Sequence, residues 1–179
     1  VSIQQLQVVN RDHGGIDGTV PGRIERVSGS APVAVFVDAG RSADAYQNTF
    51  GTLRERTDGK LIVVCGTSGD RDRSKRPIMG EIAARLADLV IVTDDDPRPE
   101  DPAQIRADLL EGARSIEHAR VEEIAEPTQA IRRAVAEATP GDVVVWMGPG
   151  SQHYRDVGGE RISFSARQQA QDALREAGW

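Results

Sequence analysis

Short apolar segments of strand length alternate along the chain with segments in which apolar residues recur at helical spacing. Ile78, Ile82 and Leu86, for example, recur every four residues and predict the buried face of a helix. Strands are predicted at 33–37, 60–65, 89–92, 119–124 and 143–147. Helices are predicted from about 42, over 77–87, from 101, over 127–138 and over 165–176, with a hairpin around 158–159. This alternation predicts an α/β fold, namely a three-layer, Rossmann-like domain of about six mostly parallel strands flanked by helices.

The alternation begins only after residue 20. Residues 1–20 include a polar, Gly-rich run at 13–18, so we expect them to form a connector or the end of a preceding domain. Residues 21–179 are then expected to form one domain of ordinary size. The chain does not begin with Met, which suggests a fragment of a longer protein.

The composition and charge of the chain argue against several classes of function. The formal net charge of -6 argues against nucleic acid, whose binding proteins carry a clustered basic face. The apolar runs are too short to span a bilayer. Cys65 is the single cysteine, which fits a reducing cytoplasm. Cys65 ends one predicted apolar strand and Trp146 lies within another, so both are expected in the core. The three histidines, His13, His118 and His153, lie far apart without ligand spacing, so no metal site is expected here.

Ligands of open parallel sheets bind beyond the carboxyl ends of the strands. Four loops leave such ends here, at 38–42, 66–76, 93–100 and 148–153. They carry many charged residues, namely Arg71, Asp72, Arg73, Asp94, Asp95, Asp96 and Arg98. Guanidinium groups pair with carboxylates and aspartates attract ammonium groups, so together they indicate a site for a zwitterion such as an amino acid.

A plainer interpretation of the same charges has equal weight. Arg71 and Arg73 could pair with Asp70 and Asp72 in a solvated loop of alternating sign, and such surface pairs contribute little. Residues 66–69 also lack the full pattern of a phosphate-binding loop.

Longer strings carry a family resemblance. PGRIERV at 21–27, VDAGRSADAY at 37–46, GTSGDRDRSKRPIMGEIA at 66–83, TDDDPRPEDP at 93–102 and GPGSQ at 148–152 occur in one order. Together they resemble the C-terminal domain of Mur ligases, specifically of the UDP-N-acetylmuramyl-tripeptide synthetase type. Those ligases add the third residue of the peptidoglycan stem peptide and carry the signature D-N-P-R.

The resemblance implies an amino-acid site. In such enzymes the Arg of the G-D-R loop holds the α-carboxylate of the incoming amino acid, which implies that role for Arg71. The D-N-P-R loop surrounds the side chain of that amino acid, which implies Asp95, Asp96 and Arg98. The late loop reaches the distal amine, which implies Gly148 and Gln152.

The resemblance also implies ATP and Mg²⁺ as cofactors. Arg23 and Asp38 match residues that reach the nucleotide, and the charge of Arg41 suits ATP phosphates. The reaction implied activates the carboxylate of UDP-MurNAc-L-Ala-D-Glu in the bacterial cytoplasm, during cell-wall synthesis, and lets a diamino acid attack. The P-loop, magnesium ligands and catalytic groups belong to domains absent from this chain, which is therefore expected to be inactive alone.

Several positions depart from the family pattern. Arg41 stands where a His is expected, Asp96 replaces the Asn of D-N-P-R, and Pro149, Ser151 and Gln152 replace Lys, His and Glu. An Asp96–Arg98 pair would neutralise the arginine within its loop, so lysine or ornithine is slightly favoured over meso-diaminopimelate. The alternatives are a non-catalytic Mur-ligase-like domain and a related amide ligase of the folylpolyglutamate or cyanophycin synthetase type.

Overall fold

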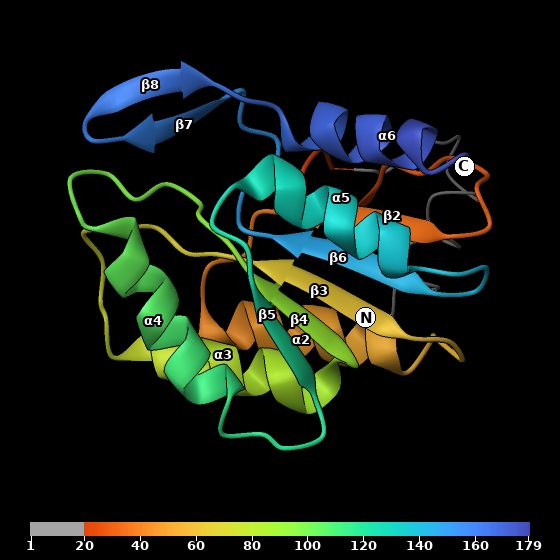
Figure 1. The fold of residues 1–179 in the computed structure, drawn as a ribbon, viewed down its shortest axis with the longest axis horizontal. Helices are drawn as coiled ribbons and strands as arrows, with labels where there is room; N and C mark the ends of the chain where they lie inside the picture. The colour runs from red at the N-terminus through yellow and green to blue at the C-terminus, as the bar shows by residue number, and fades with distance from the viewer. Residues whose placement is uncertain (1–19) are drawn as a thin grey trace, which may run out of the picture.

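Six strands form the central sheet of the computed structural model, which describes residues 20–179 (Figure 1). In chain order they are β1 Glu25–Arg26, β2 Ala34–Asp38, β3 Leu61–Cys65, β4 Leu89–Val92, β5 Arg120–Glu123 and β6 Val143–Met147. They lie in the order β1-β2-β6-β3-β4-β5; β1 runs antiparallel to β2, and the other neighbours are parallel. The predicted α/β fold with about six mostly parallel strands is confirmed.

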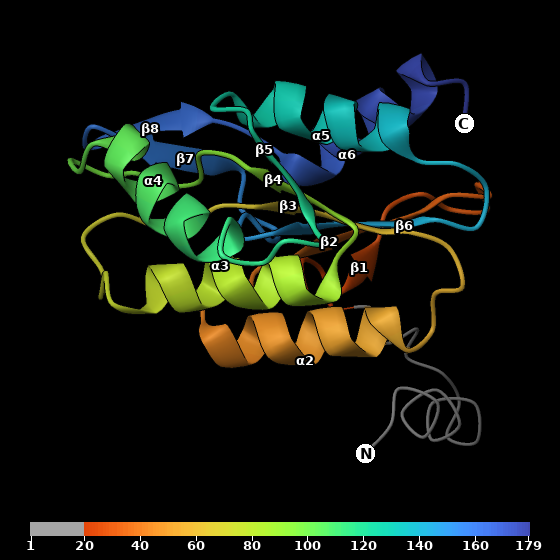
Figure 2. The same cartoon turned by 60° about the horizontal axis from the view of Figure 1, so that its bottom comes forward.

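Helices cover both faces of this sheet (Figure 2). One face carries α2 Ala43–Arg54, α3 Lys75–Leu86 and α4 Pro102–Ala113, and the other carries α5 Pro127–Glu137 and α6 Ala166–Glu176. A separate hairpin of β7 Tyr154–Val157 and β8 Glu160–Ser163 precedes α6, as the glycine pair predicted. Within the described residues no helix is long and apolar enough to cross a membrane.

The continuous apolar strands are explained by burial on both sides. Leu61, Val63 and Cys65 of β3 pack against α2, α3 and α4, whereas Ile62 and Val64 pack against α5 and α6. A strand covered on both faces needs no polar side, so its sequence does not alternate. Cys65 and Trp146 are buried in the core, as predicted.

Helix caps fix where two of the strand-end loops stop. The Ser42 hydroxyl accepts a hydrogen bond from the amide of Ala45 and begins α2. Asp101 accepts from the amide of Ala103, and Pro102 occupies the first turn of α4. The loops after β2 and β4 therefore end at defined residues, Ser42 and Asp101.

β1 was not predicted from the sequence. The turn before it needs left-handed backbone at Gly22 (φ 70°) and Ile24 (φ 44°), and the buried Glu25 accepts a hydrogen bond from the amide of Gly22 at 2.7 Å. Because β1 runs antiparallel to β2, this turn lies beside the carboxyl end of β2. The predicted connector at 1–20 falls, except for Val20, outside the described residues.

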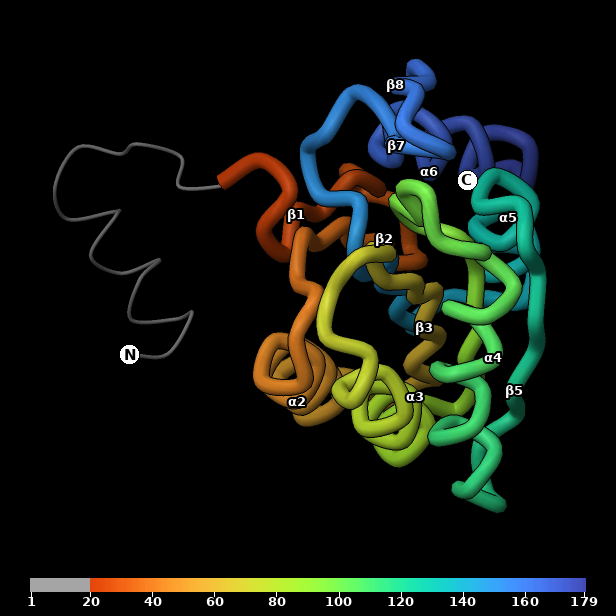
Figure 3. The backbone as a smooth tube through the Cα atoms, turned by 90° about the vertical axis from the view of Figure 1, so that its left-hand side faces the viewer, coloured from red at the N-terminus to blue at the C-terminus, as the bar shows by residue number. Residues whose placement is uncertain are grey.

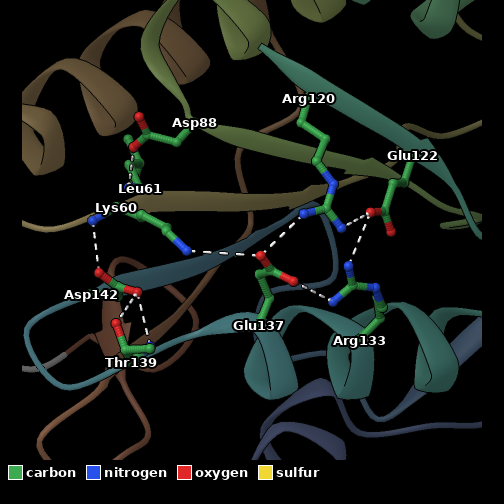
Figure 4. A network of polar contacts seen from close by, with 9 residues as sticks. All are labelled: Lys60, Leu61, Asp88, Arg120, Glu122, Arg133, Glu137, Thr139 and Asp142. Atoms are coloured by element: carbon green, nitrogen blue, oxygen red, sulfur yellow. Dashed lines mark hydrogen bonds and ion pairs between the residues drawn. The ribbon is translucent and has the colours of Figure 1, made fainter.

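A polar network ties the amino ends of the strands (Figure 4). Asp142 accepts hydrogen bonds from the amides of Lys60 at 2.8 Å and Thr139 at 2.9 Å. Glu137 pairs with Arg120 at 3.1 Å and with Arg133 at 2.9 Å. Charged groups at this edge are thus engaged with one another, and the loops with candidate chemistry lie at the opposite edge.

Candidate functional site

Five loops gather at the edge where the parallel strands end, which Figure 3 shows facing the viewer. They are the turn at 20–24 and the loops at 38–42, 66–74, 93–101 and 148–153. Their backbones touch: a Cβ on Gly69 would lie 1.9 Å from the carbonyl oxygen of Pro97, and one on Gly22 would lie 2.2 Å from the amide nitrogen of Ser151. Only glycine permits these approaches, which bring the loops into one surface.

Arg41, just after β2, joins three of these loops through its guanidinium. Its Nε donates to Oδ2 of Asp95 at 2.6 Å and its Nη2 donates to Oδ1 of Asp95 at 3.1 Å. The same Nη2 donates to Oδ2 of Asp96 at 3.1 Å and to Oε1 of Gln152 at 2.9 Å. The Asp95 and Asp96 side chains are 4% and 7% exposed. Arg41 therefore supplies the positive charge that lets two adjacent carboxylates be buried.

These charges shift the pKa values within the group. Burial alone would lower the pKa of the Arg41 guanidinium, but the carboxylates of Asp95 and Asp96 outweigh it and raise that pKa. Burial and the neighbouring Asp95 carboxylate raise the pKa of Asp96, against the opposing charge of Arg41. An arginine that stays charged suits binding and orientation of a polar ligand rather than proton transfer.

The β7–β8 hairpin holds the loop that follows β4. Arg155 donates from Nε to the carbonyl oxygen of Asp95 at 2.8 Å, and the amide of Asp156 donates to Oδ1 of Asp96 at 3.2 Å. Arg98 exchanges backbone hydrogen bonds with the hairpin, donating to the carbonyl of Asp156 at 2.9 Å and accepting from the amide of Gly158 at 2.8 Å. Because Arg98 has a φ of 57°, the loop conformation depends on these contacts.

The expected Asp96–Arg98 ion pair is wrong, because Asp96 pairs with Arg41 instead. Among residues 20–179, no group forms a hydrogen bond with the buried Nε of Arg98. Asp94 is also engaged, since it forms an ion pair with Arg106 of α4. Of the acids after β4, Asp95 and Asp96 thus belong to the Arg41 group and Asp94 does not.

The loop at 66–74 is anchored by a buried ion pair. Arg76, at the start of α3, has no exposed side-chain surface and donates to both oxygens of Glu100 at 2.8 Å and to Asp108 at 2.9 Å. Hydrogen bonds from Arg76 lower the pKa of Glu100 to about 2. Arg73 pairs with Glu100 rather than with Asp70 or Asp72, as the plainer interpretation of these charges would have it, and Arg71 is exposed.

The residues expected to meet the nucleotide lie beside the Arg41 group. Asp38 is buried, and its carboxylate accepts hydrogen bonds of 2.7 Å from the amides of Ile24 and Gly40. Its backbone carbonyl accepts from the amide of Gly148 at 2.8 Å, while Arg23 is exposed on the turn. Asp38 therefore connects the turn at 20–24 with the loops at 38–42 and 148–153.

The structure brings five predicted site residues into one group, namely Arg41, Asp95, Asp96, Gly148 and Gln152. A Cβ on Gly148 would lie 3.1 Å from Oδ2 of Asp95, which places that glycine against the acid pair. Sequence reasoning missed Arg76, Glu100, Arg155 and Asp156. Glu100 and Arg76 lie in the predicted loops, but no pattern distinguishes a buried ion pair there from a solvated one.

Comparison with protein families gives one match. The model of the family described as "Mur ligase, glutamate ligase domain" matches residues 22–150. That range contains the loops at 38–42, 66–74 and 93–101 in full, and it includes residues 22–24 of the turn and 148–150 of the last loop.

Two relatives extend the likeness over most of the chain. The UDP-N-acetylmuramyl-tripeptide synthetase of Leifsonia xyli is 52% identical over 93% of this chain and 32% of its own length. A UDP-N-acetylmuramoyl-L-alanyl-D-glutamate–2,6-diaminopimelate ligase of Synechococcus elongatus is 48% identical over 88% of this chain and 31% of its own length. The chain thus spans about a third of the length of the relatives it matches.

Solved structures agree with this. A UDP-N-acetylmuramoyl-L-alanyl-D-glutamate–2,6-diaminopimelate ligase superposes with a TM-score of 0.81 at 34% identity, over 89% of this chain and 32% of that one. A Mycobacterium tuberculosis folylpolyglutamate synthase shares only the fold, with a TM-score of 0.56 at 23% identity over 73% of this chain and 30% of that one.

Proposed function

The chain belongs to the Mur ligase family, and on that premise we propose that it is the C-terminal, amino-acid-binding domain of an ATP-dependent ligase. The ligase adds a diamino acid to UDP-MurNAc-L-Ala-D-Glu in the bacterial cytoplasm, forming the third peptide unit of peptidoglycan and ADP. The single observation that carries this proposal is the group of acids, arginine and amide built from three strand-end loops, in the order of the family motifs.

The proposed roles come from the family resemblance, and the positions of the residues are compatible with them. Arg71 is exposed on the loop after β3, free to meet the α-carboxylate of an incoming amino acid. The acid pair, Gly148 and Gln152 lie together where the distal end of that amino acid would reach. Arg98 contributes a guanidinium whose Nε has no hydrogen-bond partner in the part of the chain that the structure describes.

The nucleotide is proposed to lie on the side of Asp38 and Arg23. Mg²⁺, the acyl-activating groups and the binding site for the UDP-sugar are assigned to the rest of the ligase. In residues 20–179 no three His, Cys, Asp or Glu side chains gather as metal ligands would. The 179-residue chain alone is therefore expected neither to hydrolyse ATP nor to form an amide bond, and detectable ligation by it would contradict the proposal.

The choice of diamino acid changes with the pairing of Asp96. Lysine or ornithine was favoured because an Asp96–Arg98 pair would neutralise the arginine, and that pair does not form. Arg98 remains available for a distal carboxylate, which meso-diaminopimelate has and lysine and ornithine lack. The names of several relatives also specify 2,6-diaminopimelate. We therefore place meso-diaminopimelate ahead, with competition among the three as the deciding measurement.

The test uses the full-length ligase with Arg71→Ala. The KM of the incoming amino acid should rise more than a hundredfold, because an α-carboxylate buried without its partner costs ~3–5 kcal/mol. The KM for ATP should stay constant. Arg73→Ala is the matched control, since Arg73 lies on the same loop but pairs with Glu100. A rise in the KM for ATP alone would reassign the loop to the nucleotide.

Two alternatives make other predictions. A non-catalytic Mur-ligase-like domain predicts a parent gene without a P-loop upstream of residue 1. A folylpolyglutamate or cyanophycin synthetase type predicts ligation of glutamate or of Asp and Arg instead of a diamino acid. The neighbour of that kind is similar in fold alone, so the sequence motifs favour the tripeptide synthetase.

A further inference from the structure

The acid pair after β4 is fully hydrogen-bonded within the chain. Oδ1 and Oδ2 of Asp95 accept from Nη2 and Nε of Arg41, and Oδ2 of Asp96 accepts from the same Nη2. The remaining oxygen, Oδ1 of Asp96, accepts from the amide of Asp156. All four carboxylate oxygens therefore have a donor before any ligand arrives.

We propose, building on the function above, that Arg41 is a specificity-determining residue of the amino-acid site. Its guanidinium occupies the position between the two carboxylates that a substrate ammonium would otherwise take. The ligase consequently discriminates against amino acids whose side chain ends in a lone ammonium. This role departs from the ATP contact that its charge alone suggests.

The geometry gives the guanidinium an advantage over an ammonium. Arg41 binds Asp95 through two nitrogens and reaches Asp96 and Gln152 with one of them, in an arrangement that matches the planar fork of its side chain. An ammonium is a point charge that cannot form the forked pair. It is also tethered only through the ligand, whereas Arg41 is already in place.

Arg41 also repels a second cation. A substrate ammonium that approached the acid pair would lie beside a guanidinium whose side chain is still 25% exposed toward the surface. Specificity arises as much from such an unfavourable contact with the wrong ligand as from good contacts with the right one. A ligand that also carries a carboxylate at its distal end is attracted by the guanidinium groups of Arg41 and Arg98, and this attraction offsets the repulsion of its ammonium group.

Contacts to the backbone around Arg41 fix the position of this residue independently of its guanidinium. Lys75 of α3 donates from Nζ to the carbonyl oxygen of Arg41 at 2.9 Å. The carboxylate of Asp38 holds the amide of Gly40, immediately before Arg41, at 2.7 Å. The backbone of Arg41 is thus fixed independently of its side chain, and a substitution at this position changes chiefly the charge between the acids.

The experiment compares Arg41→Ala, Arg41→Lys and Arg106→Ala in the full-length ligase. The quantities measured are kcat/KM for meso-diaminopimelate, lysine and ornithine, and the KM for ATP. In Arg41→Ala the ratio of kcat/KM for lysine or ornithine to that for meso-diaminopimelate should rise about tenfold or more, with the KM for ATP unchanged. Arg41→Lys keeps the positive charge and should shift the ratio less.

Arg106→Ala is the matched control. Arg106 forms an ion pair with Asp94, directly before the acid pair, with a side chain 12% exposed, so its loss removes an equal charge next to the site without freeing Asp95 or Asp96. It should leave the ratio unchanged. An equal shift in Arg106→Ala would show that general charge, not the place of Arg41, sets the preference, and would overturn the inference.

Two further outcomes of the experiment would also decide the role of Arg41. An Arg41→Ala ligase whose KM for ATP rises while its amino-acid preference stays the same would make Arg41 a nucleotide ligand. If Arg41→Ala fails to fold, Arg41→Ala combined with Asp96→Asn leaves a single buried carboxylate, and the same shift toward lysine or ornithine is expected. If the unsubstituted ligase joins none of the three amino acids, the proposed function is contradicted. The Arg41 inference is then decided by calorimetry, which compares the affinities of the three amino acids for the unsubstituted ligase and for Arg41→Ala.

Discussion

Both carboxylate oxygens of Glu100 accept hydrogen bonds from the buried guanidinium of Arg76, one from each Nη atom, at 2.8 Å. Glu100 follows β4 and Arg76 begins α3, so this pair joins the loop that carries Arg71 to the loop that carries the acid pair. The site depends on it although neither residue belongs to the Arg41 group.

Glu100→Gln should destabilise the chain by about 3 kcal/mol, or roughly 6–12 °C in Tm, because Arg76 would keep its buried charge with only Asp108 as a partner. Thermal unfolding of the 179-residue chain measures this. Glu111→Gln, an exposed change on α4, is the control and should shift Tm by about 1 °C or less. Equal shifts for both variants would show that the ion pair contributes nothing.

The same pair predicts a dependence on pH. The pKa of Glu100 falls from its ordinary 4.5 to about 2 in the folded chain, chiefly through the hydrogen bonds from Arg76. Its contribution to the free energy of unfolding is therefore complete above pH 4.5 and is lost as the pH falls toward 2. Urea unfolding should show the difference between the unsubstituted chain and Glu100→Gln shrinking over that interval. A difference that stays constant would contradict the assigned cause.

Arg155→Ala should loosen the loop after β4. Arg155 donates to the carbonyl of Asp95 at 2.8 Å and its guanidinium lies 5.5 Å from the ring centre of Phe164. Loss of these contacts should speed hydrogen exchange at the amides of Arg98 and Gly158 about tenfold, equivalent to ~1.4 kcal/mol. Arg161→Ala, on the other strand of the hairpin and over Tyr154, should leave the Arg98 amide unchanged. Equal acceleration in both variants would indicate general opening of the hairpin.

Gly148→Ala should impair the proposed amino-acid site more than its strain alone predicts. Gly148 has a φ of 120°, and its added Cβ would lie 3.1 Å from Oδ2 of Asp95. Gly141 has a φ of 94° but open space around it, so Gly141→Ala measures the strain without the contact. In the full-length ligase Gly148→Ala should raise the KM of the amino acid more than tenfold, and Gly141→Ala should not. Matching KM values would remove Gly148 from the site.

The positions of β3, β4 and β6 could be predicted closely from the sequence, because burial on both faces makes each of these strands a continuous apolar run. The residues predicted at 89–92 and 143–147 are those of β4 and β6. The two-residue β1 could not be predicted, since it has no apolar run and arises from a turn with left-handed backbone at Ile24.

The loops of the site could be predicted from strand ends, but not which side chains pair. Arg41 lies 54 and 55 residues from its aspartate partners and 111 residues from Gln152. The sequence also allows Asp96 to pair with Arg98, which is only two residues away. Left-handed backbone at Arg98 and its hydrogen bonds to the hairpin fix that residue instead, and no local pattern contains them.

The place of β6 in the sheet has a consequence for how the domain is made. β6 pairs with both β2 and β3, with Val144 beside Val35 on one side and Ile62 on the other, although it is the last of the six strands in the chain. Until residue 147 has emerged from the ribosome, β2 and β3 lack the strand that joins them, so any sheet formed from β1–β2 or from β3–β4–β5 would have an open edge. Unpaired edges of this kind recruit other chains. A ribosome that stalls before β6 is therefore expected to leave a nascent chain prone to aggregation, because the central sheet is complete only when β6 is inserted between β2 and β3.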